Sequence, residues 1–187
     1  MKKSNLFCSG ENIAEYDYPV LNERAVRASA GIMLLLASIA SINGFILNKF
    51  IVIPYIVGFL LLNFLVGVFI NPKFVPTYFV GKWIVSKQKP IYIGAIQKRF
   101  AWSLGVILSA TIFILSLFLI NDSSYFNIVC PLCLICIILM YFESVFGICI
   151  GCKLYFLAIK LKLIKKSKHN PKCMGDSCEI NKKDWIS

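Results

Sequence analysis

Three uncharged apolar stretches, each long enough to cross a bilayer, constrain this chain more than any other feature. They cover residues 28–47, 50–70 and 102–120 and contain 20, 21 and 19 residues. A helix of about 20 apolar residues crosses the hydrocarbon core of a membrane. The chain is 58% hydrophobic and 16% charged, which leaves too little polar surface to cover a soluble globule. The sequence therefore predicts an integral membrane protein.

A fourth apolar region, residues 123–152, contains Glu143 as its only charge and is longer than one crossing requires. Because proline is tolerated in the first turn of a helix, Pro131 indicates that the fourth span covers residues 130–152. The expected fold class is all-α, a polytopic integral membrane protein with four transmembrane helices in a small bundle. The expected regions are an N-terminal segment (1–25), a membrane domain (26–164) with an interfacial loop (71–101), and a Cys-containing tail (165–187).

The basic residues fall almost entirely on one side of these four spans. Segments 1–27, 71–101 and 153–187 hold four, six and nine of them, whereas the opposite side holds only Lys49. Lys and Arg accumulate in cytoplasmic segments, so we expect both termini on the cytoplasmic side of the cell membrane. Topology accounts for the net charge of +11, so the expected partner is the lipid bilayer and not nucleic acid. The sequence leaves the oligomeric state open.

The chain has eight cysteines, most of them clustered, and these are its main candidates for reactive or metal-binding side chains. Cys149 and Cys152 form a CxxC pair that we interpret as a redox or persulfide pair, and the adjacent Lys153 favours a thiolate. A permanent disulfide is not expected on the cytoplasmic side. With Cys173 and Cys178 the pair reads C-x2-C-x20-C-x4-C, which is near the spacing of a four-thiolate site for zinc or another thiophilic metal. The alternative is a flexible tail with two exposed thiols.

Glu143 is the second chemical signal, because a carboxylate within a spanning helix is costly and normally faces the bundle interior. At 100° per residue it shares one helix face with two cysteines and a methionine. We interpret this face as an intramembrane acid beside a sulfur-lined path; the path residues are Cys130, Cys133, Cys136 and Met140. The alternative is a glutamate that fixes helix packing. Its expected polar partners in the other spans are Asn43, Asn63, Ser109, Thr111 and Ser116.

Three groups of residues also carry a family resemblance: Leu21-Asn22-Glu23-Arg24 with Arg27, Gln97-Lys98-Arg99-Phe100-Ala101 with Gly105, and Phe142-Glu143 followed by Gly147-Ile148-Cys149-Ile150-Gly151-Cys152-Lys153-Leu154-Tyr155. They resemble the bacterial membrane family labelled domain of unknown function 4395, over roughly residues 18–157. The resemblance implies a small four-helix membrane protein without an established biochemical role. Some relatives occur beside or fused to thioredoxin-like or rhodanese-like domains, which implies thiol or sulfur traffic with such a protein as a separate partner.

Three functions are compatible with these residues. The first is thiol/disulfide or sulfane-sulfur handling by Cys149 and Cys152. The second is a transporter or channel for a small sulfur species or a soft metal ion along the Cys/Met/Glu face. The third is a non-enzymatic membrane scaffold with a four-thiolate zinc clasp. The sequence identifies neither a substrate nor whether the protein is an enzyme.

Overall fold

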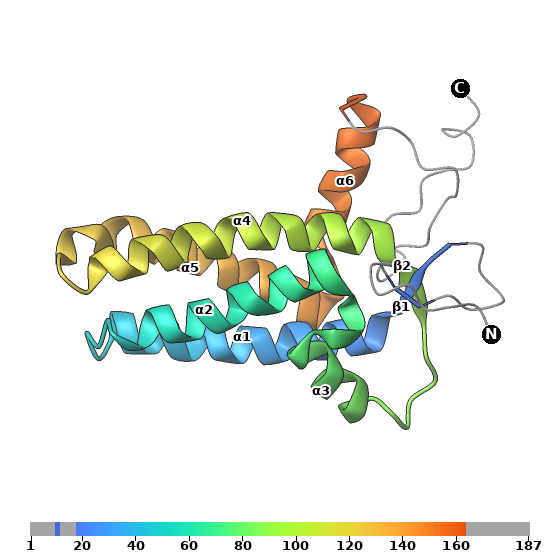
Figure 1. Cartoon of the computed structure of the whole chain (residues 1–187), viewed down its shortest axis with the longest axis horizontal. Helices are drawn as coiled ribbons and strands as arrows, with labels where there is room; N and C mark the ends of the chain where they lie inside the picture. Colours follow the sequence, from blue (N-terminus) through green and yellow to red (C-terminus); the bar gives the residue numbers. More distant parts are fainter. Residues whose placement is uncertain (1–9, 12–17, 164–187) are drawn as a thin grey trace.

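Four long helices form an elongated bundle in the computed structural model, which describes residues 10–11 and 18–163 (Figure 1). They are α1 (Glu23–Phe45), α2 (Val52–Leu65) continued by the π-helical turn η1 (Val66–Ile70), α4 (Ala95–Leu119), and α5 (Phe126–Tyr141) between the 3-10 turn η3 (Ser123–Tyr125) and the π-helical turn η4 (Phe142–Phe146). Each is long and apolar enough to span a membrane, which confirms the expected fold class.

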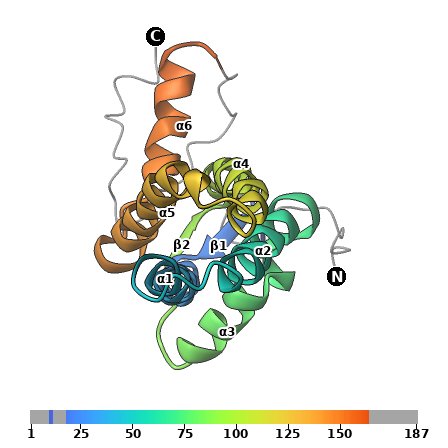
Figure 2. The same cartoon turned by 90° about the vertical axis from the view of Figure 1, so that its left-hand side faces the viewer.

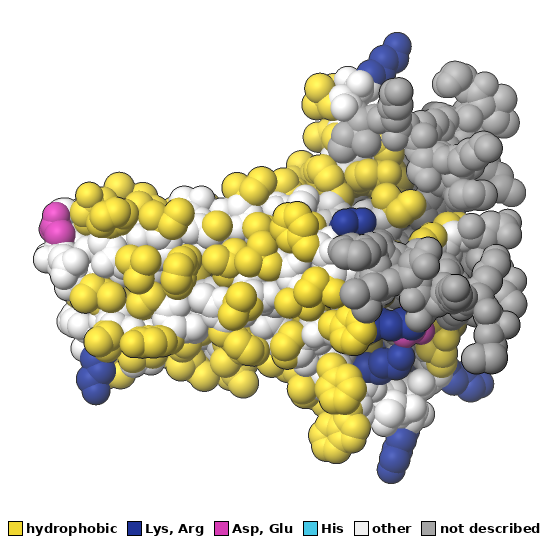
Figure 3. All heavy atoms as spheres, viewed as in Figure 1, with side chains coloured by type: hydrophobic (Ala, Val, Ile, Leu, Met, Phe, Trp, Pro, Cys, Tyr) yellow, Lys and Arg dark blue, Asp and Glu magenta, His cyan; other side chains and the backbone are white. Residues whose placement is uncertain are grey.

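The shorter elements gather at one end of the bundle, here called the strand end. They are β1 (Val20–Asn22), β2 (Tyr92–Gly94), the 3-10 turn η2 (Pro72–Phe74), α3 (Pro76–Ile84) and α6 (Ile150–Lys160). Seen along the bundle axis, α1, α2, α4 and α5 form a ring, and α3 and α6 project outward from it in opposite directions (Figure 2). On the face shown in Figure 3, hydrophobic side chains are spread along the bundle, and most of the visible basic side chains lie near the strand end. This distribution suits helices surrounded by lipid tails.

A short antiparallel ribbon, absent from the expected elements, ties the start of α1 to the start of α4. Leu21 pairs with Ile93 in the register of β1 and β2, and both side chains are buried. Asn22 then caps α1 by accepting a hydrogen bond from the backbone N–H of Arg24 at 3.1 Å. The ribbon fixes where the first turn of α4 lies, and this turn carries part of the site described below.

Buried polar groups hold α3 against α1 and α2. The hydroxyl of Thr77 in α3 hydrogen-bonds with the hydroxyl of Ser29 in α1 at 2.7 Å. The same Thr77 hydroxyl and the Thr77 backbone N–H donate to Oδ1 of Asn63 in α2, at 3.0 and 3.2 Å. Because paired polar groups avoid the cost of unsatisfied burial, these contacts place α3 more specifically than apolar packing alone.

The first and third spans begin earlier than their uncharged stretches, because their first turns contain charged residues. α1 begins at Glu23 and not at residue 28, and α4 begins at Ala95 and not at residue 102. The segment expected as an interfacial loop, 71–101, therefore contains η2, α3, β2 and the first turns of α4.

The expected fourth span, 130–152, is wrong at both ends. The helical segment starts at Ser123, so Pro131 lies inside α5, where it removes one backbone hydrogen bond. It ends at Phe146, because Gly147 adopts the left-handed conformation (φ +68°) that stops a helix. Arg27 of α1 satisfies the freed carbonyls by donating to Val145 at 2.8 Å and Ser144 at 3.4 Å.

Replacing Thr77 with valine removes the hydroxyl that joins α3 to Ser29 and Asn63. We expect Thr77→Val to lower the free energy of unfolding by about 1–3 kcal/mol, because the Asn63 amide oxygen loses a donor in a buried position. Thermal unfolding of the purified protein in detergent, followed by circular dichroism, measures the loss.

Thr111→Val is the matched control, because the exposed Thr111 hydroxyl donates only to the carbonyl of Ile107 in its own helix. Equal losses in the two variants would contradict a role for Thr77 in holding α3.

Candidate functional site

Lys98, in the first turns of α4, is fully buried and is the centre of the candidate site. Its ammonium forms an ion pair with the carboxylate of Glu143 and lies 3.8 Å from Sγ of Cys149. The Trp102 ring, one helical turn further along α4, has its centroid 5.8 Å from the Lys98 nitrogen. A buried ammonium is strongly unfavourable without such partners, so these contacts account for its position.

Glu143 reaches Lys98 from η4, the widened turn at the end of the fourth span. Its side chain is buried, as expected for a carboxylate within a span. π-helical turns shift the side chains that follow them and occur frequently at functional sites. The partner of Glu143 is a cation from α4 and not one of the five polar side chains expected from the sequence. Asn63, which was among them, instead bonds Thr77.

Cys149 and Cys152 lie at the beginning of α6, outside the fourth span. Cys149 is the N-cap residue, and its sulfur accepts a hydrogen bond from the backbone N–H of Cys152 at 3.3 Å. Their exposed fractions are 2% and 4%. A helix N-terminus presents unpaired N–H groups and a partial positive charge, which both stabilise a thiolate.

The two thiols differ in electrostatic environment. A hydrogen bond from the Cys152 thiol, the Lys98 ammonium and the Cys152 backbone N–H lower the pKa of Cys149 below its ordinary value, although burial and the Glu143 carboxylate oppose them. The pKa of Cys152 is raised well above its ordinary value, because its thiol proton is held by the Cys149 sulfur and the group is buried. Of the two sulfurs, Cys149 is therefore the one whose surroundings favour a thiolate, whereas Cys152 retains its proton.

A glycine lets α6 approach α4 closely enough to make this arrangement. A Cβ atom on Gly151 would lie 2.6 Å from Cβ of Ala101 and 2.8 Å from its Cα. On the next turn, the rings of Tyr155 and Phe100 pack with centroids 5.5 Å apart. The first turn of α6 thus rests directly on α4, one turn beyond Lys98.

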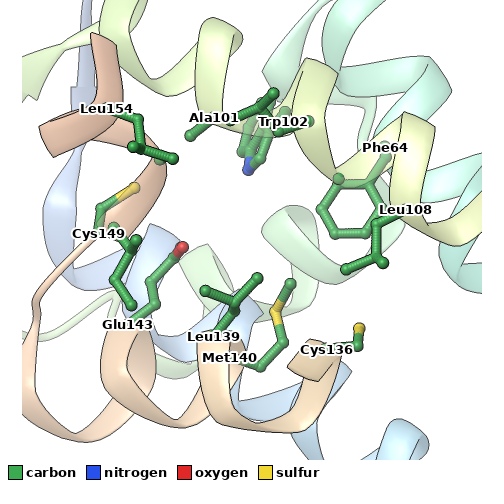
Figure 4. A pocket seen from close by; sticks show the side chains of 14 residues that line it. Phe64, Ala101, Trp102, Leu108, Cys136, Leu139, Met140, Glu143, Cys149 and Leu154 are labelled. Carbon is green, nitrogen blue, oxygen red and sulfur yellow. The ribbon is translucent and has the colours of Figure 1, made fainter. Parts of the chain in front are cut away.

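A cavity of about 100 Å³ adjoins the site (Figure 4). Glu143 and Cys149 point into it, Met140 and Cys136 border it from α5, and Trp102 and Phe64 lie across from them. Three residues of the predicted sulfur-lined face, Cys136, Met140 and Glu143, therefore share one cavity with Cys149 of the CxxC pair. Cys133 packs instead in a separate apolar cluster with Ile53, Val57 and Val129, and neither it nor Cys130 lines this cavity.

The remaining site predictions have different outcomes. Lys153 is exposed, and the cation that contacts the Cys149 sulfur is Lys98. Cys130, Cys133, Cys136, Cys149 and Cys152 are free of disulfides. Cys173 and Cys178 lie outside the described residues, and within residues 10–11 and 18–163 no three side chains form a metal-binding group. The four-thiolate site thus stays a prediction.

Sequence reasoning missed the role of Lys98. It counted this residue among the basic loop charges, because Lys98 precedes an uncharged stretch and is followed by Arg99. The available signal was Glu143 itself, since a carboxylate in a span requires a compensating partner.

Comparison with known proteins gives a family but no activity. No curated protein and no solved structure matches the chain. A family model described as a domain of unknown function, DUF4395, matches residues 21–160. The matched region contains all four candidate spans together with Lys98, Glu143, Cys149 and Cys152. The chain therefore belongs to the DUF4395 family.

Proposed function

We propose that this protein is a membrane dithiol protein that exchanges disulfides or sulfane sulfur through Cys149. The observation that supports this proposal most directly is the position of the Cys149 sulfur, which caps α6 and lies 3.8 Å from the buried Lys98 ammonium. The helix N-terminus and the ammonium both favour a thiolate, which is the reactive form of cysteine.

The exchange proceeds in two displacement steps. The Cys149 thiolate attacks one sulfur of a disulfide, the sulfur–sulfur bond breaks, and the other sulfur leaves as a thiolate. The Cys152 sulfur then attacks Cys149 and releases the second thiolate. The products are a Cys149–Cys152 disulfide and two thiols, which take the two protons of the pair. Two electrons pass from the pair to the substrate, and an external dithiol returns them.

In this proposal, the role of the Lys98–Glu143 pair is to place a positive charge beside the sulfur of Cys149. With Cys149 protonated, the ammonium and the carboxylate neutralise each other. When Cys149 ionises, the same ammonium lies against the new negative charge and offsets part of it, and the site then holds one cation and two anions.

The orientation expected from basic residues completes the proposal. Both termini and the strand end are proposed to lie on the cytoplasmic side of the cell membrane. A separate thioredoxin-like or rhodanese-like protein is a proposed partner, but α6 would have to move before a protein could reach a sulfur that is 2% exposed.

A transport role is the second candidate, because Cys136 and Met140 share the cavity with Glu143 and Cys149. In that role Glu143→Gln would abolish uptake of a soft metal ion into liposomes, whereas Cys152→Ser would preserve it.

Replacing each cysteine of the pair in turn shows which one is the nucleophile and which one resolves the mixed disulfide. We expect Cys149→Ser to abolish reduction of a small disulfide by the purified protein, and Cys152→Ser to accumulate a mixed disulfide on Cys149. Mass spectrometry of cysteine peptides measures both outcomes. Cys136→Ser is the matched control, since Cys136 borders the same cavity but lies on α5. Equal activity in all three variants would refute the proposal.

Removing the Lys98 charge tests the origin of the thiolate. Lys98 lowers the pKa of Cys149, whereas Glu143 raises it to a lesser extent, so removing both charges leaves a smaller net rise in the pKa and less thiolate at neutral pH. In Lys98→Gln/Glu143→Gln we expect alkylation of Cys149 to be about threefold slower at neutral pH, with its pH profile shifted to higher pH. The double substitution leaves no unpaired buried charge. Quantitative alkylation across pH, with peptide-level detection, measures this shift.

Lys153→Gln is the control for the loss of a lysine, because Lys153 is exposed beside the pair. An unshifted profile in the double variant, or an equal shift in the control, would show that Lys98 does not outweigh Glu143 in stabilising the thiolate.

Two introduced cysteines test the proposed orientation. Ser124 lies at the end of the bundle opposite the strand end, Ser86 follows α3, and both are exposed. In intact cells a membrane-impermeant maleimide should label Ser124→Cys at once and Ser86→Cys only after permeabilisation. The opposite pattern would reverse the proposed topology.

A further inference from the structure

The working sulfur faces a cavity and not the protein surface. Cys149 and Cys152 have exposed fractions of 2% and 4%, so the disulfide of a folded protein cannot reach either thiol while α6 keeps its place. The open space beside Cys149 is the cavity between α4, α5 and α6 (Figure 4). The nature of this cavity therefore restricts the substrate.

The cavity selects small and uncharged molecules. Its volume is about 100 Å³. An engineered apolar cavity of about 150 Å³ accommodates benzene, so this one admits a molecule of roughly six heavy atoms or fewer. Phe64, Trp102, Leu108 and Leu139 supply much of its lining, and Glu143 is the only charged side chain among the described residues that line it. A charged molecule would lose its hydration there without gaining a partner, since Glu143 is already paired with Lys98.

The lining of the cavity reaches the side of the bundle at Leu154. α6 leaves the bundle between α4 and α5 (Figure 2), and the cavity lies beneath its first turns. The rim residue Leu154 is 44% exposed, and its neighbours Leu104 and Leu139 are half-buried. In a bilayer this apolar rim faces lipid and not water.

We infer that the substrate is a small uncharged short-chain disulfide, which reaches Cys149 through this cavity from the lipid side. This inference rests on the proposed function. The Cys149 thiolate attacks one sulfur of the bond, and the departing sulfur takes the proton released by the pair. Cys152 then displaces the retained sulfur as the second thiol, so the substrate gains two electrons and the pair becomes a disulfide.

Two thiol reagents of the same chemistry but different charge test the route. The full-length protein in lipid vesicles is treated with methyl methanethiosulfonate, which is small and neutral, or with its anionic sulfonatoethyl analogue. The rate at which each reagent modifies Cys149 is measured by peptide mass spectrometry and divided by the rate of the same reagent with free glutathione. We expect the neutral reagent to react at least about tenfold faster than the charged one, because burying an ion costs several kcal/mol. In protein unfolded by a denaturing detergent, this preference for the neutral reagent should disappear.

Filling the cavity provides the structural arm of the test. Leu139→Trp places a larger side chain in the cavity and should slow the reaction of the neutral reagent with Cys149 about tenfold or more. Ile138→Trp, on the exposed face of α5, should leave that rate nearly unchanged. Leu108→Phe and its exposed neighbour Ile107→Phe form a second such pair on α4, in case Leu139→Trp does not fold.

The ultraviolet absorbance of the Cys149 thiolate, defined as the part lost in Cys149→Ser, separates this inference from the proposed function. Equal calibrated rates for both reagents, or an unaffected rate in both cavity variants, would overturn the lipid-side route. If the thiolate absorbance is nevertheless present, the proposed function survives that result. Absence of the thiolate absorbance would refute the proposed function and this inference together.

Discussion

The arrangement at the strand end depends on the ion pair between Lys98 and Glu143. A buried ammonium or carboxylate without a partner costs several kcal/mol, so neither charge is tolerable unless the start of α4 and the end of the fourth span stay in contact. The β1–β2 ribbon fixes the first of these positions, and the Arg27 contacts to the carbonyls of Ser144 and Val145 fix the second. Removing one partner would thus disturb more than one interaction.

The same pair sets what a neighbouring thiol can do. Lys98 contacts both Glu143 and the Cys149 sulfur, so one cation serves two acceptors. Cys136 borders the same cavity but lies in the middle of an apolar helix, where no helix terminus supports a negative charge. Position relative to a helix N-terminus and to Lys98 therefore distinguishes Cys149 from the other cysteines within residues 18–163.

The sequence was sufficient to predict the four spans and the CxxC pair, because apolar length and cysteine spacing are local properties. It was not sufficient for the boundaries. Charged first turns hid the starts of α1 and α4, and the uninterrupted apolar composition across Gly147 hid the end of the fourth span. Lys98 was misinterpreted because positive charge beside a span normally reflects topology, and only the three-dimensional contact with Glu143 separates it from Arg99.

The role of Cys149 as the cap of α6 links its chemical state to the local stability of that helix. A thiolate is a strong hydrogen-bond acceptor, whereas a sulfur in a disulfide is neutral and accepts weakly. Oxidation of Cys149 thus weakens the bond from the Cys152 N–H that begins α6. The backbone hydrogen bond from Lys153 to the Cys149 carbonyl and the contact between Gly151 and Ala101 are then left to hold the first turn in place. Since α6 contributes Cys149, Ile150, Gly151 and Leu154 to the cavity lining, oxidation of this one sulfur would loosen a helix that covers the cavity.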